Sequence, residues 1–217
     1  MSGPTDNLDS ISEQLRQNLT TKDRAREKML PLCREAIRCS SEAIRAVHRQ
    51  EFEKAEGLLE AARKRLAESE QALANSFELI NIGSMRDAQK EFTEGNIVLS
   101  MVTRKPLPTP AELGVDSAAY LNGMAEAASE MRRYILDSIR KGDMSRGEEL
   151  LTAMDDIYNV LVTIDFPDAV TGGLRRTTDQ LRGVLERTRS DLTLVITQQD
   201  LGQRLEKFES NLEESEK

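Results

Sequence analysis

The sequence predicts an all-α protein, a single domain of about six or seven helices. Apolar residues recur at helical spacing along nearly the whole chain, and no long segment alternates with period two. Aromatic residues make up 4% and tryptophan is absent, which disfavours a β-sandwich or barrel. Long helices with wide apolar stripes often bury one face in a bundle and another in a neighbouring subunit, so we also expect an oligomer.

The apolar stripes place the helices in order along the chain. They cover residues 11–19, 32–47, 55–77, 85–102, 120–139, 150–161 and 174–195. Pro31 stands between the first two stripes, where it should kink or interrupt the helical path. The third stripe ends at Phe77.

Capping and breaking residues divide these helices. Prolines at 106, 108 and 110 alternate with other residues, which cannot continue a helix and favours extended backbone. Asp116 is a candidate N-cap for the following helix, and Gly142 a candidate C-cap. We divide the chain into an N-terminal arm or first helix at residues 1–20, a helical domain at 21–200 and an acidic polar tail at 201–217.

Composition restricts the possible functions. The formal net charge is −8, so the whole chain does not attract nucleic acid, and an RNA site would need a local basic surface. No apolar run approaches 18 residues and no signal-peptide pattern is present, which predicts a cytoplasmic protein that does not bind a membrane.

The few histidines and cysteines exclude several chemistries. Cys33 and Cys39 are six apart in a helical pattern, which fits neither zinc binding nor a disulfide framework, so we expect buried thiols. His48 is the single histidine and lies in a helical context, where a structural role is favoured. A histidine pair for acid–base cleavage of RNA is therefore absent.

The positions of four glutamates are informative. Glu91 and Glu94 share one helical face with Val98 and Met101, so two carboxylates continue an apolar seam. The next helix offers Glu126 and Glu130, spaced i, i+4.

If these two helices pack together, three or four carboxylates converge. Such carboxylates repel unless a cation joins them, and Mg²⁺ or Mn²⁺ prefers oxygen ligands of this kind. A bound divalent ion can activate water and neutralise a phosphoryl oxygen, which suffices to hydrolyse a phosphodiester. The alternative is that these pairs are ordinary helix-surface glutamates, since the chain has 38 acidic residues.

One segment resembles the signature of the translin/Trax family. That signature reads approximately as Tyr-Leu-x-Gly, a helix with Glu, Leu or Met, and Arg, and then Ser-Val-x-x-Gly-Asp. This chain has Tyr120-Leu121-Asn122-Gly123, Glu130-Met131-Arg132 and Ser138-Ile139-Arg140-Lys141-Gly142-Asp143. The resemblance extends with lower specificity over residues 20–200, and we identify a Trax-like, catalytic-type member of archaeal type.

The resemblance implies an all-α subunit of a hollow octamer. Translin-type members bind RNA or single-stranded DNA, whereas Trax-type members cleave RNA with a divalent metal. The Trax pattern Gln-Glu-aromatic-x-Glu is similar to Lys90-Glu91-Phe92-Thr93-Glu94 here, and the acids after the signature glycine match Glu126 and Glu130. Two departures are Lys90 in place of Gln and Glu126 in place of the usual Asp.

The acidic set gives our functional hypothesis, a Mg²⁺- or Mn²⁺-dependent endoribonuclease that cleaves single-stranded RNA inside a homo-oligomer. Glu91, Glu94 and Glu126 would ligate the metal and position water, with Glu130 as a fourth or outer ligand. The alternatives are a non-catalytic, translin-like protein that binds RNA or single-stranded DNA, and a purely structural helical oligomer.

Basic residues near these acids are candidates for phosphate binding. They are Arg86, Lys90, Arg133 and Lys141. Backbone contacts of this kind carry no sequence preference, and the shortage of aromatic residues disfavours base stacking. The alternative is that these cations pair with neighbouring glutamates on helix surfaces.

Overall fold

The computed structural model describes residue 3 and residues 5–73 and 83–215. Helices are the one regular element in these ranges, which confirms the predicted all-α class. Six are long: α1 (Leu8–His48), α2 (Phe52–Ala72), α3 (Gly83–Thr103), α5 (Ser117–Arg140), α6 (Gly147–Leu161) and α8 (Leu174–Ser215). Two have a single turn, α4 (Pro110–Leu113) and α7 (Asp168–Thr171). Phe77, where we expected the third stripe to end, lies outside the described residues.

The helices form two compact units. The first contains Met1–Met124 and Ala169–Gly172, and the second contains Ala125–Asp168 and Gly173–Lys217. The boundary at Met124 falls inside α5, which is one unbroken helix. The predicted division into arm, domain and tail stays a prediction.

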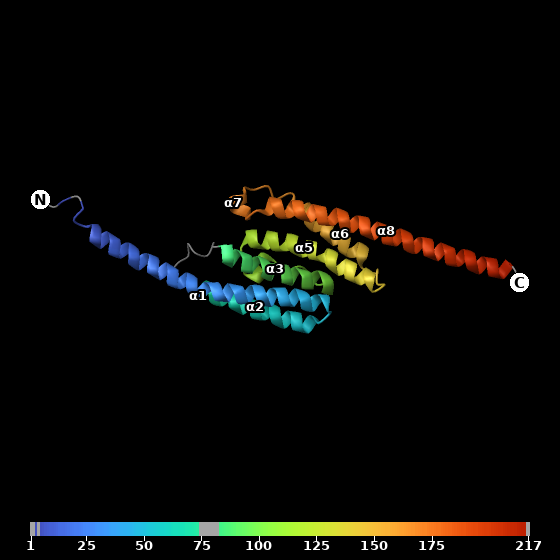
Figure 1. Ribbon diagram of the computed structural model, residues 1–217, viewed down its shortest axis with the longest axis horizontal. Helices are drawn as coiled ribbons and strands as arrows, with labels where there is room; N and C mark the ends of the chain where they lie inside the picture. The colour runs from blue at the N-terminus through green and yellow to red at the C-terminus, as the bar shows by residue number, and fades with distance from the viewer. Residues whose placement is uncertain (1–2, 4, 74–82, 216–217) are drawn as a thin grey trace. The chain divides into compact units, whose positions relative to one another are not determined.

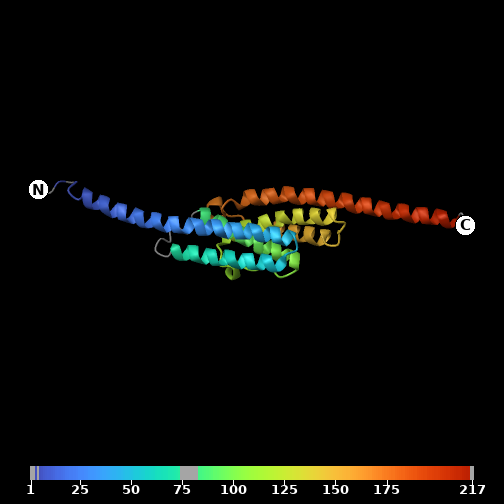
Figure 2. The same cartoon turned by 60° about the horizontal axis from the view of Figure 1, so that its bottom comes forward.

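Three helices form the core of the first unit. The second half of α1 packs against α2 and α3, as Figures 1 and 2 show, and their facing side chains are almost fully buried. Cys33 and Cys39 are buried free thiols, as predicted. The Cys33 Sγ lies 3.1 Å from the Met29 Sδ, and burial raises the pKa of this thiol. Cys33 is therefore a packing residue.

The predicted interruption at Pro31 is wrong. α1 continues through this proline as a helix of 41 residues. A proline inside a helix removes one backbone hydrogen bond, but neighbouring residues can keep the helical conformation when packing stabilises them. Pro31 itself is exposed, whereas Met29, Cys33 and Ala36 on the other face are buried. Tertiary packing on both sides of the proline therefore holds the helix together.

The predicted capping residues are confirmed. The Asp116 carboxylate accepts hydrogen bonds from the Ala118 and Ala119 N–H groups, at 2.9 and 3.4 Å, at the start of α5. Gly142 follows the end of α5 with a φ of 79°, in the left-handed region that glycine favours. The proline segment ends α3, and Thr109 and Glu112 form a capping box at the start of α4.

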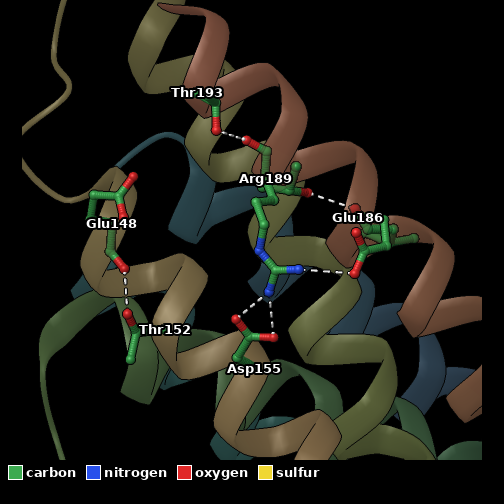
Figure 3. Close-up of polar contacts among 8 residues, drawn as sticks. Glu148, Thr152, Asp155, Glu186, Arg189 and Thr193 are labelled. Carbon is green, nitrogen blue, oxygen red and sulfur yellow. Dashed lines mark hydrogen bonds and ion pairs between the residues drawn. The ribbon is translucent and has the colours of Figure 1, made fainter. Parts of the chain in front are cut away.

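In the second unit, α6 packs against α8 through buried leucine and methionine side chains. Arg189 of α8 links the two helices, as Figure 3 shows. Its guanidinium donates to a carboxylate oxygen of Asp155 in α6 at 2.8 Å and to Glu186 one turn away at 2.9 Å. The hydrogen bond and charge of Asp155 raise the pKa of Arg189.

We expect Arg189→Met to lower the free energy of unfolding by no more than about 1 kcal/mol, because both partners are partly exposed and water screens the pair. Urea denaturation measures this loss, which should shrink at high salt concentration. Asp155→Asn is the matched variant, and the double variant should lose little more than either single one. A strongly additive loss would show that the two side chains act independently.

The ends of α1 and α8 differ from the rest of the fold. No residue between Leu8 and Lys28 is buried, and none between Thr193 and Leu212. α8 runs to Ser215, so most of the segment expected as a tail is helical. Within residues 5–73 and 83–215, we find no helix with the length and apolar character that a membrane span requires.

Candidate metal centre

Glu91 and Glu94 lie on α3 at the edge of the first unit's core. Both side chains are half-buried. Val98 and Met101, further along the same face, are buried as the predicted seam requires. The two carboxylates therefore extend a packed face, where they are partly withdrawn from water.

Glu91 is held by a residue that the sequence did not single out. The Ser41 hydroxyl on α1 donates to a carboxylate oxygen of Glu91 at 3.3 Å. This hydrogen bond restricts the orientation of the carboxylate. Fifty residues separate the partners, and no local pattern in the sequence links them.

Gly123 explains the glycine of the family signature. A Cβ at this position would lie 2.6 Å from the Lys90 carbonyl oxygen and 2.7 Å from the Thr93 Cβ. Both distances are shorter than van der Waals contact, so only glycine allows this approach of α5 to α3. The first turns of α5 are thereby fixed beside the helix that carries Glu91 and Glu94.

Glu126 follows Gly123 by three residues, nearly one turn further along the same unbroken helix. One carboxylate oxygen from each of Glu91, Glu94 and Glu126 lies within 4.8 Å of the others, and all three residues are half-buried. We call these three residues the acidic triad.

Glu130 is not a member of the acidic triad. It lies one turn beyond Glu126 on α5, is half-buried, and has a carboxylate oxygen 3.3 Å from a guanidinium nitrogen of Arg133. Its proposed function as a fourth or outer ligand stays a prediction.

The donor set of the acidic triad suits a hard divalent cation. All three donors are carboxylate oxygens, and Mg²⁺ prefers oxygen ligands at about 2.0–2.1 Å while keeping several waters. Oxygens on opposite sides of such an ion would be about 4 Å apart. The printed spacing of at most 4.8 Å can therefore be closed by small side-chain movements.

The four candidate phosphate-binding residues have different environments. Arg86 and Lys90 lie on α3 with the two glutamates of the first unit, and both are half-buried. Arg133 pairs with Glu130 and, at 4.0 Å, with Asp137 on the same helix. Lys141 is exposed just after α5. The ion pairs of Arg133 fit the alternative of a helix-surface salt bridge, while contact with RNA stays a prediction for all four.

Two further signature residues organise the first unit. The Tyr120 hydroxyl donates to the Pro108 carbonyl at 2.8 Å, and burial is the main cause that raises its pKa. The buried Asn122 amide donates to the Thr171 and Ala118 carbonyls, both at 2.8 Å. The Tyr-Leu-x-Gly segment therefore anchors the proline segment and the turn at α7, and it also allows the close approach at Gly123.

We expect Tyr120→Phe to destabilise the protein by about 1 kcal/mol, because it leaves the half-buried Pro108 carbonyl without this donor. Thermal or urea unfolding measures the change. Tyr158→Phe is the matched control, since the Tyr158 hydroxyl bonds to none of the described residues. Equal losses in the two variants would contradict a specific role for Tyr120.

The fold and the acidic triad thus define an all-helical protein with a carboxylate cluster beside a signature glycine, and known proteins share this fold. The chain is similar to AfC3PO in a solved complex with duplex RNA, with 32% identity and a TM-score of 0.76 over 85% of this chain and 96% of that one. A crystal structure of AfC3PO matches over the same shares, with a TM-score of 0.75. Apo-NeC3PO has a TM-score of 0.73 over 90% of this chain and 99% of that chain, and its 18% identity shows the fold alone.

A sequence relative covers a similar range. The uncharacterized protein MJ0175 of Methanocaldococcus jannaschii is 28% identical over 199 residues, which are 89% of this chain and 86% of that protein. No family model matches the chain. With 32% identity to AfC3PO across nearly the whole of that protein, the chain belongs to the translin/Trax family, as its signature predicted.

Proposed function

We propose that this protein is a metal-dependent endoribonuclease that cleaves single-stranded RNA as a homo-oligomer. The observation that carries the proposal is the acidic triad, whose members stand at the positions that the Trax-type pattern uses for catalysis. A translin-like protein that only binds nucleic acid has no need for three carboxylates at one point.

The chain's own residues would hold and orient the reactants. Glu91, Glu94 and Glu126 bind a divalent cation, Mg²⁺ or Mn²⁺, and orient the attacking water through their carboxylate oxygens. When bound, the cation supplies positive charge to the phosphodiester and acidifies water. Ser41 keeps the Glu91 carboxylate in one orientation through its hydrogen bond. Glu130 supports this arrangement from one turn further along α5.

RNA as the ligand is supported by the family. AfC3PO has been solved with duplex RNA, and the similarity to it covers 85% of this chain. The net charge of −8 requires that basic residues gather locally, and Arg86 and Lys90 stand on the same helix as two members of the acidic triad. In a hollow octamer these cations would face the lumen and the acids would face outward. RNA binding should then weaken as salt is added.

The experiment is a cleavage assay on end-labelled single-stranded RNA, with the full chain in MgCl₂, MnCl₂ or EDTA. A duplex of the same sequence is run in parallel to identify the substrate class. We expect cleavage with either metal ion and none with EDTA, because chelation leaves the acidic triad without its cation. A filter-binding measurement in EDTA reports RNA affinity separately from cleavage.

Each alternative gives a different result. Binding without cleavage in any metal would reject the nuclease and support the translin-like binding protein. Neither binding nor cleavage would leave a structural helical oligomer. Cleavage that persists in EDTA would reject the metal mechanism.

A further inference from the structure

The first part of α1 presents an uncovered apolar stripe. We define the N-terminal arm as Leu8–Lys28, in which no residue is buried. Figures 1 and 2 show it extending as a single helix beyond α2 and α3 of its own unit. Its large apolar side chains are 42 to 63% exposed and recur every three or four residues; they are Leu8, Ile11, Leu15 and Leu19. This spacing places them along one side of the helix.

The end of α8 presents a second stripe of the same kind. We define the C-terminal arm as Thr193–Leu212, which likewise contains no buried residue. Its last four large apolar side chains are 48 to 61% exposed and are spaced by four, three and four residues; they are Leu201, Leu205, Phe208 and Leu212. An alternation of three and four is the pattern of a helix that packs against another helix.

The two stripes match in length. Each runs for about three helical turns, roughly 17 Å along its helix. Large apolar side chains gathered on one exposed face mark a surface that another molecule covers, whereas single exposed leucines do not. A helix with four such side chains in a row gains most by packing against a stripe of equal length.

Charge distinguishes a pair of unlike arms from a pair of like arms. Residues 16–28 carry five basic and two acidic side chains, whereas residues 206–217 carry five acidic and two basic ones. Two C-terminal arms would bring like charge together, and so would two N-terminal arms. One arm of each kind brings opposite charge together, which fixes the choice of partner.

We propose that the N-terminal arm of one copy packs against the C-terminal arm of a second copy. This inference deepens the proposed function, since it names the surfaces that join copies in the homo-oligomer. A contact between two different surfaces of identical chains is heterologous, so each chain offers one donor arm and one acceptor arm. Successive contacts of this type close into a ring when the rotation between copies allows it.

The test uses the full chain with one charged residue in either stripe. Leu15→Asp breaks the N-terminal arm, and Leu205→Asp breaks the C-terminal arm. We expect each variant alone to sediment at a smaller mass than the wild type in analytical ultracentrifugation. An equimolar mixture of the two should regain mass above either variant alone, because each variant retains the arm that the other lacks.

Matched controls lie on the opposite sides of the same helices. Gln17→Asp and Gln203→Asp add the same charge two residues away and should keep the wild-type mass. Leu19→Asp and Phe208→Asp repeat the test at second positions in the stripes. Unchanged circular dichroism and melting temperature show that the variants fold, as the exposure of these sites leads us to expect.

Three results would overturn the proposal. One is a wild type that sediments as a single chain of 24.4 kDa. Another is a full wild-type mass for both arm variants, which would mean that the arms join no copies. The third is loss of mass by the Leu205→Asp variant alone, which would indicate pairing of two C-terminal arms. Mass is measured without RNA, so failure of the nuclease assay leaves each of these results unaffected.

Discussion

Glu94→Gln is expected to lower the rate of RNA cleavage by about 100-fold or more, the scale seen when one charge-stabilising group is removed from a catalytic site. Glutamine has the same shape as glutamate but no negative charge, and it is a weaker ligand for a hard cation. Glu94 is one of three carboxylates whose oxygens lie within 4.8 Å of one another. Without its charge, the remaining pair would bind a divalent cation more weakly, so the loss should be partly recovered at high Mg²⁺ concentration.

The control for this prediction is Glu53→Gln, which neutralises an exposed glutamate in the first turn of α2. Cleavage by this variant should match that of the wild type at every Mg²⁺ concentration. RNA binding by the Glu94→Gln variant should persist in EDTA, because phosphate contacts come from basic residues. Wild-type cleavage by Glu94→Gln would remove the acidic triad as the catalytic centre.

The sequence predicted the helices well because their determinants are local. Apolar spacing gave the stripes, and Asp116 and Gly142 mark helix ends through interactions with their own neighbours. The continuation of α1 through Pro31 was not predictable in this way. It depends on Met29 and Cys33 packing against other helices, which a local rule for proline cannot include.

The candidate site divides along the same line. Spacing on one helix brought out Glu91 and Glu94, and the family pattern added Glu126. Ser41 escaped notice because serine on a helix is common and its partner lies fifty residues away. The Tyr-Leu-x-Gly signature was found as a pattern, but the reason for its glycine required coordinates.

Gly123→Ala is expected to cost about 2 kcal/mol of stability and to reduce cleavage by about 100-fold, the typical effects of an overpacked contact and of a catalytic group misplaced by about 1 Å. The new Cβ would lie 2.6 Å from the Lys90 carbonyl oxygen, and backbone cannot move aside as a flexible side chain can. α5 would have to shift away from α3, and Glu126 would shift with it. Urea denaturation measures the first effect and the RNA assay the second.

Gly57→Ala is the matched control, because it makes the same substitution within α2 where nothing lies within 4 Å of the new Cβ. Alanine favours a helix over glycine by about 0.5–1 kcal/mol, so this variant should be more stable than the wild type and cleave RNA normally. The two substitutions are thus expected to change stability in opposite directions. If Gly123→Ala were instead stabilising, helix propensity would outweigh the close contact, and the signature glycine would need another explanation.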